Sequence, residues 1–424
     1  MKYLYTNEFA QKMDALDPLG KFREQFYFPR QAGGKEAIYL CGNSLGLQPK
    51  STKAAIDEVL SDWRELGVKG HFEAKKPFTT YHESLGEKMA TIVGANHQEV
   101  VIMNSLTVNL HLMMVSFYRP NKKRYKILIE KNAFPSDQYA VKSQISFHGI
   151  SVNKGLIELE PRKGELTLRT EDILKVIENK GDEIALIMLG GLNYYTGQAF
   201  DMKRITAFGH KMGCTVGFDL AHGAGNLDLK LHDWKVDFAV WCTYKYINSG
   251  PGGVAACSVH QDHIKRTDLP RFTGWWGHDK ATRFLMNDTF VPIQSAEGWQ
   301  MSNETVISMA ALSASLDIFM EAGIDQIITK SRLLTGYLEF LITGIESEYI
   351  DIITPSEPSE RGAQLSIRVI HSNRSLFEEI SKQGVIADWR EPDVIRIAPA
   401  PLYNSFMDVY QFVQILKEAL NKMQ

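Results

Sequence analysis

An aspartate and a lysine occupy positions where a catalytic site could form. Asp219 directly follows the apolar run 215–218, and Lys245 comes 26 residues later, shortly after the apolar run 238–241. If both runs are strands of an open α/β sheet, both residues lie at carboxyl ends of strands, where such sheets bind ligands. A lysine amine can form a Schiff base with the aldehyde of pyridoxal phosphate (PLP), and a carboxylate can keep the pyridine nitrogen protonated. The pairing predicts a PLP site; the alternative is a helix-capping aspartate and a solvated lysine.

Further residues near apolar runs could complete such a site. Residues 100–114 predict a strand, a turn and then a helix from position 108, so free backbone N–H groups and the Thr107 hydroxyl could bind a phosphate. Phe134 follows another predicted strand, and its ring could stack on a flat heterocycle. His222 lies three residues after Asp219, beside the expected pyridine ring. The alternatives for Thr107 and Phe134 are an ordinary helix cap and a buried core side chain.

Arg396 lies within a short apolar strand. In the run 394–398, the alternation of a strand places Arg396 on the face opposite to Ile395 and Ile397. An arginine in such a strand is unfavourable unless its charge is paired. Its partner is either a substrate carboxylate, held by both arms of the guanidinium, or a local Asp or Glu.

The elements that must position these residues follow from the apolar pattern. Short apolar runs separated by helix-length segments are typical of a mostly parallel sheet covered by helices on both faces. The runs lie at 100–103, 127–129, 184–189, 215–218, 238–241 and 254–259. The middle of the chain is therefore predicted to be an α/β domain.

The pattern changes near residue 302. Ser302, Asn303 and Glu304 offer helix N-cap chemistry, and Gly323 offers a stop, which predicts a long helix between them. Strands near 363–369 and 394–398 and a final helix near 405–422 predict a smaller α+β domain. We expect an N-terminal segment (1–70) that packs on the small domain, a large PLP-binding α/β domain (71–300) and a small C-terminal α+β domain (301–424).

Composition narrows the class of protein. The 424 residues are 44% hydrophobic and 23% charged with a net charge of −3, which predicts no nucleic-acid partner and no anionic membrane surface. No apolar run approaches the roughly 18–20 residues of a spanning helix, and no signal peptide is recognisable. Four cysteines without C-x-x-C spacing predict neither a disulfide framework nor a zinc cluster. H-E-x-x-H and P-loop motifs are absent from the sequence. We expect a cytoplasmic two-domain enzyme that binds no metal.

Six blocks, in order along the chain, resemble the kynureninase family of PLP enzymes, whose fold is that of aspartate aminotransferase (fold type I). They are residues 42–49, 104–112, 134–137, 217–222, 244–246 and 396–406. The resemblance implies a fold type I α/β protein with a large domain and a smaller C-terminal domain, PLP as its cofactor, and a homodimer with shared active sites.

The resemblance also assigns roles to individual residues. It implies that the cofactor is bound by Leu106, Thr107, Phe134, Asp137, Asp219, His222, Tyr244, Lys245, Trp275 and Asn303. Lys245 would carry the cofactor, Asp219 would pair with the pyridine nitrogen, and Tyr244 would donate a proton. Trp275 and Asn303 would come from the neighbouring subunit. Arg396 would bind the substrate carboxylate. Where relatives have a serine, this chain has Gly190, so one hydroxyl contact to the cofactor is expected to be missing.

The implied activity is hydrolysis of L-kynurenine or 3-hydroxykynurenine to anthranilate or 3-hydroxyanthranilate and L-alanine, in tryptophan catabolism or NAD biosynthesis. His71 and Asn303 resemble residues of relatives that prefer 3-hydroxykynurenine, which their side chains could hydrogen-bond. Alternatives are an aminotransferase, a cysteine desulfurase or a non-catalytic PLP-binding regulator. A desulfurase needs a C-terminal nucleophilic cysteine, and no cysteine follows Cys257. A regulator of this fold would need a DNA-binding segment, which the first 70 residues do not resemble.

Overall fold

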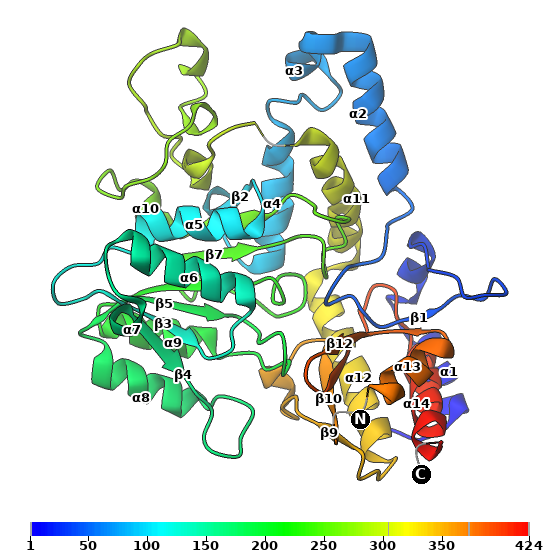
Figure 1. Ribbon diagram of the computed structural model, residues 1–424. Helices are drawn as coiled ribbons and strands as arrows, with labels where there is room; N and C mark the ends of the chain where they lie inside the picture. The colour runs from blue at the N-terminus through cyan, green and yellow to red at the C-terminus, as the bar shows by residue number, and fades with distance from the viewer. Residues whose placement is uncertain (1, 304, 372–373, 423–424) are drawn as a thin grey trace.

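A seven-stranded sheet forms the centre of the larger part of the molecule (Figure 1). The computed structural model describes residues 2–303, 305–371 and 374–422. The strand order is β2-β8-β7-β6-β5-β3-β4, and β8 runs antiparallel to both of its neighbours while the other pairs are parallel. The strands are β2 (Val100–Ile102), β3 (Lys126–Glu130), β4 (Leu156–Leu159), β5 (Ile184–Gly190), β6 (Thr215–Asp219), β7 (Phe238–Trp241) and β8 (Ala256–Val259). The expectation of a mostly parallel sheet is confirmed.

Helices cover both faces of this sheet because successive strand residues point to opposite sides. Ile127 and Ile129 pack in the core under α5 and α6, whereas Leu128 between them packs in the core on the other face. Figure 1 shows α5 above the sheet, α6 in front of it and α8 below it, and the buried residues of α8 and α9 belong to the core on the face of Leu128. The helices of this part are α4 (Tyr81–Val93), α5 (Leu106–Phe117), α6 (Pro135–Phe147), α7 (Val152–Gly155), α8 (Thr170–Lys180), α9 (Met202–Lys211) and α10 (Gln261–Ile264).

Two helix starts differ from the sequence prediction. Helix α5 begins at Leu106 rather than at 108, because Ser105 is already in the extended conformation of an N-cap. The helix expected from Ser302 begins later: α11 (Val306–Ala322) has Thr305 as its N-cap, so the prediction that Ser302 or Asn303 caps it is wrong. Glu304 lies outside the described residues. Gly323 ends α11 as predicted, with a positive φ of 75°.

The smaller part is built on a four-stranded antiparallel sheet of order β12-β13-β10-β9. Its strands are β9 (Ile350–Ile352), β10 (Leu365–Val369), β12 (Asp388–Arg390) and β13 (Val394–Ile397), and its helices are α12 (Ile324–Thr343), α13 (Ser375–Lys382) and α14 (Phe406–Asn421). The predicted final helix is confirmed, and a reciprocal capping box between Ser405 and Asp408 fixes its start.

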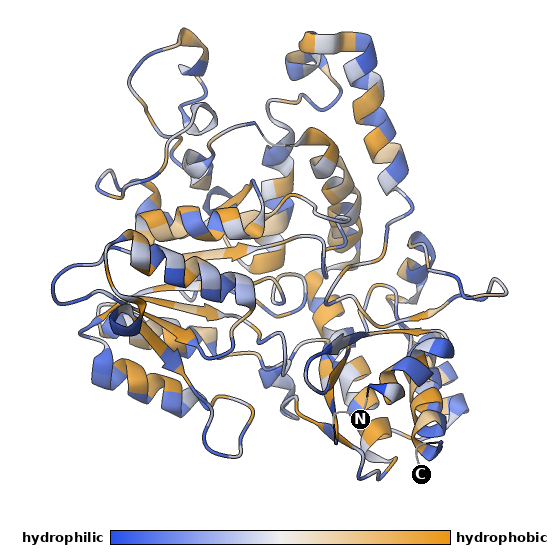
Figure 2. Ribbon diagram, viewed as in Figure 1, coloured by the Kyte–Doolittle hydropathy of each residue, from blue (hydrophilic) through white to orange (hydrophobic). Residues whose placement is uncertain are grey.

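The N-terminal residues divide between the two parts. Helix α1 (Asn7–Ala15) packs on α14, and β1 (Ile38–Tyr39) pairs in parallel with β11 (Val385–Ile386), so this stretch shares the core of the smaller part. Helix α2 (Thr52–Leu66) instead packs on α11 and, with α3 (Gly70–Glu73), projects from the top of the molecule in Figure 1. Figure 2 shows hydrophobic residues along this projecting α2.

No single helix among the described residues is long and apolar enough to cross a membrane. The pair α11 and α12 passes such a test together on length and composition, and the two helices are bent by 82° at Gly323.

Candidate active site

Lys245 lies in a short segment after β7 whose backbone is held in place from two sides. The Thr243 hydroxyl lies 2.6 Å from the Ser249 hydroxyl and donates to the carbonyl of Val254 over 2.5 Å, which folds the segment back on itself. From the other side, the backbone N–H of Gly46 donates to the carbonyl of Tyr244 over 2.8 Å. A Cβ at position 46 would lie 2.3 Å from the Lys245 carbonyl oxygen, so only glycine permits this approach.

The side chain of Lys245 points to a histidine and an aromatic ring. Its Nζ lies 3.0 Å from Nε2 of His222 and 5.9 Å from the centre of the Phe134 ring. Burial, together with the positive charges of Lys245 and Arg396, lowers the pKa of His222 well below its usual value. The imidazole is therefore neutral and accepts a hydrogen bond from the lysine amine.

Two aspartates meet beside this lysine. Asp219 is the last residue of β6, and its carboxylate accepts a 2.7 Å hydrogen bond from the backbone N–H of Ala221. Asp137, in the first turn of α6, hydrogen-bonds to Asp219. Burial and the Asp219 charge raise the pKa of Asp137 well above its usual value, so the proton shared by the pair belongs mainly to Asp137. Asp219 is left as the charged acceptor that faces Lys245.

A third carboxyl group, which the sequence analysis did not identify, lies in the same cavity. Glu130 ends β3, is 3% exposed, and accepts a 3.1 Å hydrogen bond from the backbone N–H of Gly190. Burial, and to a lesser degree the Asp219 charge, raises its pKa to about 7. A Cβ at position 190 would lie 3.1 Å from Oε1 of Glu130, so this carboxyl occupies the space next to the glycine. The sequence signal was available: Glu130 follows an apolar run just as Asp219 does.

The first turns of two helices, α5 and α6, also line the cavity. Leu106 and Thr107 lie in the first turn of α5, and Ser136 lies in the first turn of α6. The hydroxyls of Thr107 and Ser136 are 2.7 Å apart. The N–H groups of the first turn of α5 and the N–H of Ser136 in α6, with the two hydroxyls, make a suitable site for a phosphate. Ser136 lies in the block 134–137, and the sequence prediction assigned it no role.

Phe134 precedes α6 and is 44% exposed, so the alternative of a buried core side chain is wrong. Its ring meets that of Tyr194 edge-to-face, with ring centres 5.3 Å apart. The full lining of the cavity is Leu106, Thr107, Glu130, Phe134, Ser136, Asp137, Gly190, Leu192, Tyr194, Asp219, Ala221, His222, Tyr244 and Lys245. Every residue predicted to bind the cofactor except Trp275 and Asn303 is among them.

Arg396 is buried at the edge of this site and is paired. It lies opposite Asp388 in the register of β13 and β12, and both arms of its guanidinium contact the Asp388 carboxylate, the Nε–Oδ1 distance being 2.6 Å. Its third nitrogen donates to the carbonyl of Tyr194 over 2.9 Å. The ion pair with a local aspartate, considered as an alternative from the sequence, is therefore present in the structure.

Trp275, Asn303 and His71 lie outside the cavity. The Trp275 side chain is 46% exposed, and its indole N–H donates to the carbonyl of Arg283 over 3.0 Å. Asn303 is exposed just before α11. His71, in α3, lines a separate apolar cavity that includes Trp63 and Ile307.

Known proteins that are similar to this chain over nearly its whole length are kynureninases. The chain is 56% identical over 416 residues to the kynureninase of Koribacter versatilis, covering 98% of each protein. It is 53% identical to that of Flavobacterium psychrophilum (99% of each) and 46% identical to that of Mus musculus (98% of this chain, 93% of the relative). The family model of the kynureninase C-terminal domain matches residues 327–416.

Solved structures share the fold at low sequence identity. A cysteine desulfurase from Thermococcus onnurineus superposes with a TM-score of 0.76 at 16% identity and covers 100% of both chains. A cysteine desulfurase from Escherichia coli gives 0.75 at 18% identity, over 95% of this chain and 98% of that one. The expected fold type I is confirmed. With full-length relatives at 46–56% identity, this chain belongs to the kynureninase family.

Proposed function

We propose that the protein is a PLP-dependent hydrolase that cleaves L-kynurenine, or its 3-hydroxy derivative, to anthranilate or 3-hydroxyanthranilate and L-alanine. The observation that supports it best is the convergence of Lys245, Asp219 and His222 in one buried cavity of a chain that belongs to the kynureninase family. Tryptophan catabolism or NAD biosynthesis would be the pathway, and the cytoplasm the location.

The side chains of the cavity suit PLP. Among the described residues, Oδ1 of Asp137 and Nδ1 of His222 are buried without a hydrogen-bond partner, so the cavity holds polar atoms that a ligand would satisfy. We assign the cofactor phosphate to Leu106, Thr107 and the start of α5, and the face of the ring to Phe134. When bound, PLP supplies an electron sink for the electrons released from the substrate Cα.

The roles of the chain's own residues follow from their surroundings. Lys245 would hold the cofactor, and its free amine would be the base that takes the α-proton of the substrate. Asp137 carries the proton of the aspartate pair, so Asp219 is charged. The charged Asp219 would keep the pyridine nitrogen of PLP protonated. His222 accepts a hydrogen bond from Lys245 and orients its amine.

Tyr244 is assigned as the proton donor to the carbon released by Cβ–Cγ cleavage. Burial raises the pKa of its hydroxyl, so Tyr244 carries its proton at neutral pH and can donate it. Arg396 is assigned to the substrate carboxylate. Because Asp388 holds two of its nitrogens and the Tyr194 carbonyl holds the third, we assign to these partners the task of fixing the guanidinium. Each of the two terminal nitrogens has a second N–H that could be donated to the substrate carboxylate.

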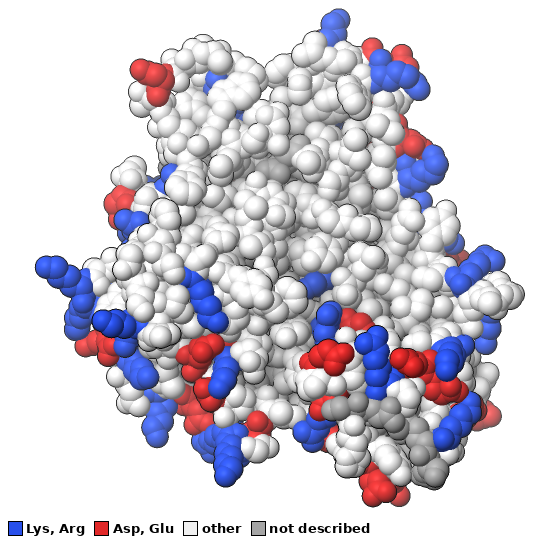
Figure 3. All heavy atoms as spheres, viewed as in Figure 1, with Lys and Arg blue, Asp and Glu red and all other residues white. Residues whose placement is uncertain are grey.

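We propose a homodimer in which Trp275, Asn303 and His71 complete the site of the neighbouring subunit. Apolar side chains are exposed near these residues: Phe72 in α3, Val68 just before it, and Leu285 and Met286 in the segment between α10 and α11. On the face drawn in Figure 3, charged side chains gather around the lower part, and the hollow between the two upper projections is almost free of them. Such uncharged patches are typical of subunit interfaces.

The proposed division into an N-terminal segment (1–70), a large domain (71–300) and a small domain (301–424) is supported by the separate core of the smaller part. Helix α11 argues for a modification, because it lies within 301–424 but shares the core of the larger part, and α2 packs on it there. A net charge of −3 supports the absence of nucleic-acid and membrane partners.

The experiment that separates this function from an aminotransferase or a desulfurase measures products. The protein with PLP is mixed with L-kynurenine, and anthranilate fluorescence and L-alanine are followed together. Equal amounts of both support the proposal. A keto acid formed without anthranilate would identify an aminotransferase. Sulfur released in a parallel mixture with L-cysteine would identify a desulfurase, and no turnover of either substrate would identify a binding protein.

A further inference from the structure

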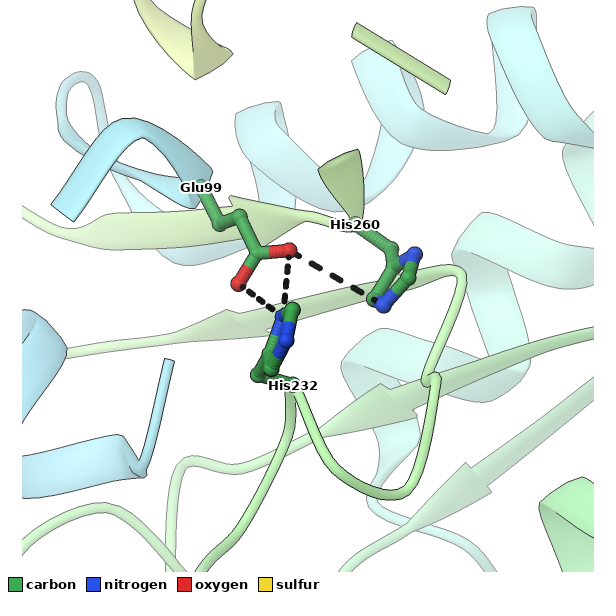
Figure 4. Close-up of side chains that lie close together, drawn as sticks. All are labelled: Glu99, His232 and His260. Carbon is green, nitrogen blue, oxygen red and sulfur yellow. Dashed lines mark hydrogen bonds and ion pairs between the residues drawn. The ribbon is translucent and has the colours of Figure 1, made fainter. Parts of the chain in front are cut away.

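Three metal-ligating side chains meet at the edge of the large sheet opposite to Lys245. Glu99 directly precedes β2, His232 lies in the loop before β7, and His260 directly follows β8. Because β8 is antiparallel to β2 and β7, these three positions fall at the same edge, at the amino ends of the parallel strands. Figure 4 shows the carboxylate of Glu99 pointing toward both imidazoles. The cluster plays no part in the proposed reaction.

The spacing of the three groups is close to that of a metal site. Oε1 of Glu99 lies 3.0 Å from Nδ1 of His232 and 3.9 Å from Nε2 of His260. Zinc bonds of about 2.0–2.1 Å to N and O in a tetrahedron place neighbouring ligand atoms about 3.3 Å apart. The observed distances lie on either side of this value. The imidazole planes are only 18° apart, so His232, whose side chain is 30% exposed, must turn to direct a nitrogen at a shared ion.

His260 supplies the observation that points to a ligand. Its side chain is 4% exposed, and among the described residues its Nε2, which faces Glu99, is buried without a hydrogen-bond partner. Its Nδ1 accepts a 3.3 Å hydrogen bond from the backbone N–H of Asp262 and lies 3.4 Å from the carboxylate of the same residue. Metal binding at Nε2 requires the imidazole proton on Nδ1, where this carboxylate would accept it in place of the backbone contact.

Glu99 is buried and held in place as a ligand would be. Its two oxygens accept 2.8 Å hydrogen bonds from the backbone N–H groups of Asn96 and Gln261. These bonds fix the carboxylate, and because each oxygen can accept more than one bond, its remaining lone pairs face Nδ1 of His232, at 3.0 and 3.1 Å. A bound metal ion would replace the proton between these atoms. Among the described residues, only His232 and His260 form ion pairs with Glu99, so no lysine or arginine occupies the position of a cation.

A second cluster of histidine and glutamate side chains shows the difference. His82, Glu83 and Glu297 also lie close together, but Lys280 sits among them, 2.9 Å from Glu83 and 2.6 Å from Glu297. Lys280 is therefore the cation of this second cluster. Among the described residues, no lysine or arginine forms an ion pair with Glu99.

We propose that Glu99, His232 and His260 bind one divalent transition-metal ion of the zinc type, with water in the position that faces solvent beside His232. Two imidazoles and one carboxylate are ligands that suit zinc. The ion would connect three segments that the chain brings together only by folding, so it stabilises the native state and has no part in the chemistry at Lys245.

The test uses the full-length protein with PLP bound and Zn²⁺ or Co²⁺ alone as the probe. Titration calorimetry should show one Zn²⁺ site per chain, and Co²⁺ should give the visible absorption of a nitrogen- and oxygen-ligated ion. Zn²⁺ should raise the thermal unfolding temperature and leave kcat unchanged. His260→Ala and His232→Ala should each weaken binding by more than about tenfold, the loss that follows even from removing a group that only supports a ligand.

His97→Ala is the matched control, because His97 is an exposed histidine on the same turn as Glu99. This variant should bind Zn²⁺ as the parent does. The proposal is overturned if the parent binds no Zn²⁺ at micromolar concentration, or if His232→Ala and His260→Ala bind it as tightly as His97→Ala. If His260→Ala fails to fold, the test rests on His232→Ala. This variant changes a partly exposed loop residue, so we expect it to fold, and circular dichroism checks this.

Discussion

Nε2 of His222 lies 3.0 Å from Nζ of Lys245, and burial lowers the pKa of this histidine, so a neutral imidazole accepts a hydrogen bond from the lysine amine. The two residues come from segments after neighbouring parallel strands, β6 and β7. The contact orients the lysine amine, and His222, whose pKa is lowered, does not take a proton from it. It also explains why a histidine is tolerated in a site with positive charges nearby.

His222→Phe removes this acceptor and keeps a flat side chain. A hydrogen bond to a charged group contributes about 1.5–3 kcal/mol, so we expect kcat/KM to fall about 10- to 100-fold while PLP still binds. Steady-state kinetics and the cofactor absorption spectrum measure both. His97→Phe, a change at an exposed histidine, is the control. Full activity in His222→Phe would contradict the role assigned to His222.

Glu130 makes stability depend on pH. Its pKa is about 7 in the folded protein against 4.5 ordinarily, so between these values the folded state binds more protons than the unfolded state. The free energy of unfolding therefore falls as pH rises from about 4.5 to about 7, by about 3 kcal/mol at most. In cofactor-free protein, urea unfolding at several pH values should show this decrease, and Glu130→Gln should remove it.

The control for Glu130 is Glu158→Gln, which changes an exposed glutamate on the neighbouring strand β4. It should keep the pH dependence of the parent. If Glu130→Gln shows the same decrease as Glu158→Gln, another group is responsible.

Arg396→Lys tests substrate binding against a purely structural ion pair. A lysine cannot contact both Asp388 and a substrate carboxylate through a planar fork, so we expect KM to rise about 10- to 100-fold with the PLP spectrum unchanged. Asp388→Asn should raise KM in the same direction, because it releases the guanidinium from its fixed position. A loss of thermal stability in both variants with unchanged KM would show that Arg396 serves the fold alone.

The chain is expected to favour 3-hydroxykynurenine over kynurenine in kcat/KM. The His71 imidazole and the Asn303 amide could hydrogen-bond the added ring hydroxyl, and a site built for such a bond discriminates against a substrate without it. His71→Phe and Asn303→Thr should reduce the ratio of the two kcat/KM values, measured by product absorbance. A parent enzyme that prefers kynurenine, or variants that keep the ratio, would refute this preference and leave the family unchanged.

Residues next to strands were the most predictable part of the site. Asp219 and Lys245 follow apolar runs that can only be buried strands, so their positions at one sheet edge follow from topology. Strand β4 was not predicted, because alternation of exposed and buried residues over four positions gives a weak signal. The start of α11 was placed too early, since several residues before Val306 could cap a helix and packing decides between them.

Contacts that depend on strand register or that join distant segments could not be predicted. The pairing of Arg396 with Asp388 depends on the register of two short strands, and a shift by one residue would have placed Asp388 on the other face. The cluster of Glu99, His232 and His260 joins a glutamate to two histidines that follow more than a hundred positions later, with no spacing motif to indicate it. Trp275, Asn303 and His71 lie outside the cavity of one chain, and the sequence carries no feature that identifies an interface.

The most direct test of the central claim is to locate the cofactor on the chain. The protein with PLP is reduced with borohydride, digested, and mapped by mass spectrometry, with and without prior addition of L-kynurenine. We predict a pyridoxyl group on Lys245, and less of it when kynurenine is present, because the substrate amine displaces the lysine. A pyridoxyl group on any other lysine, or labelling of Lys245 that kynurenine does not change, would contradict the account.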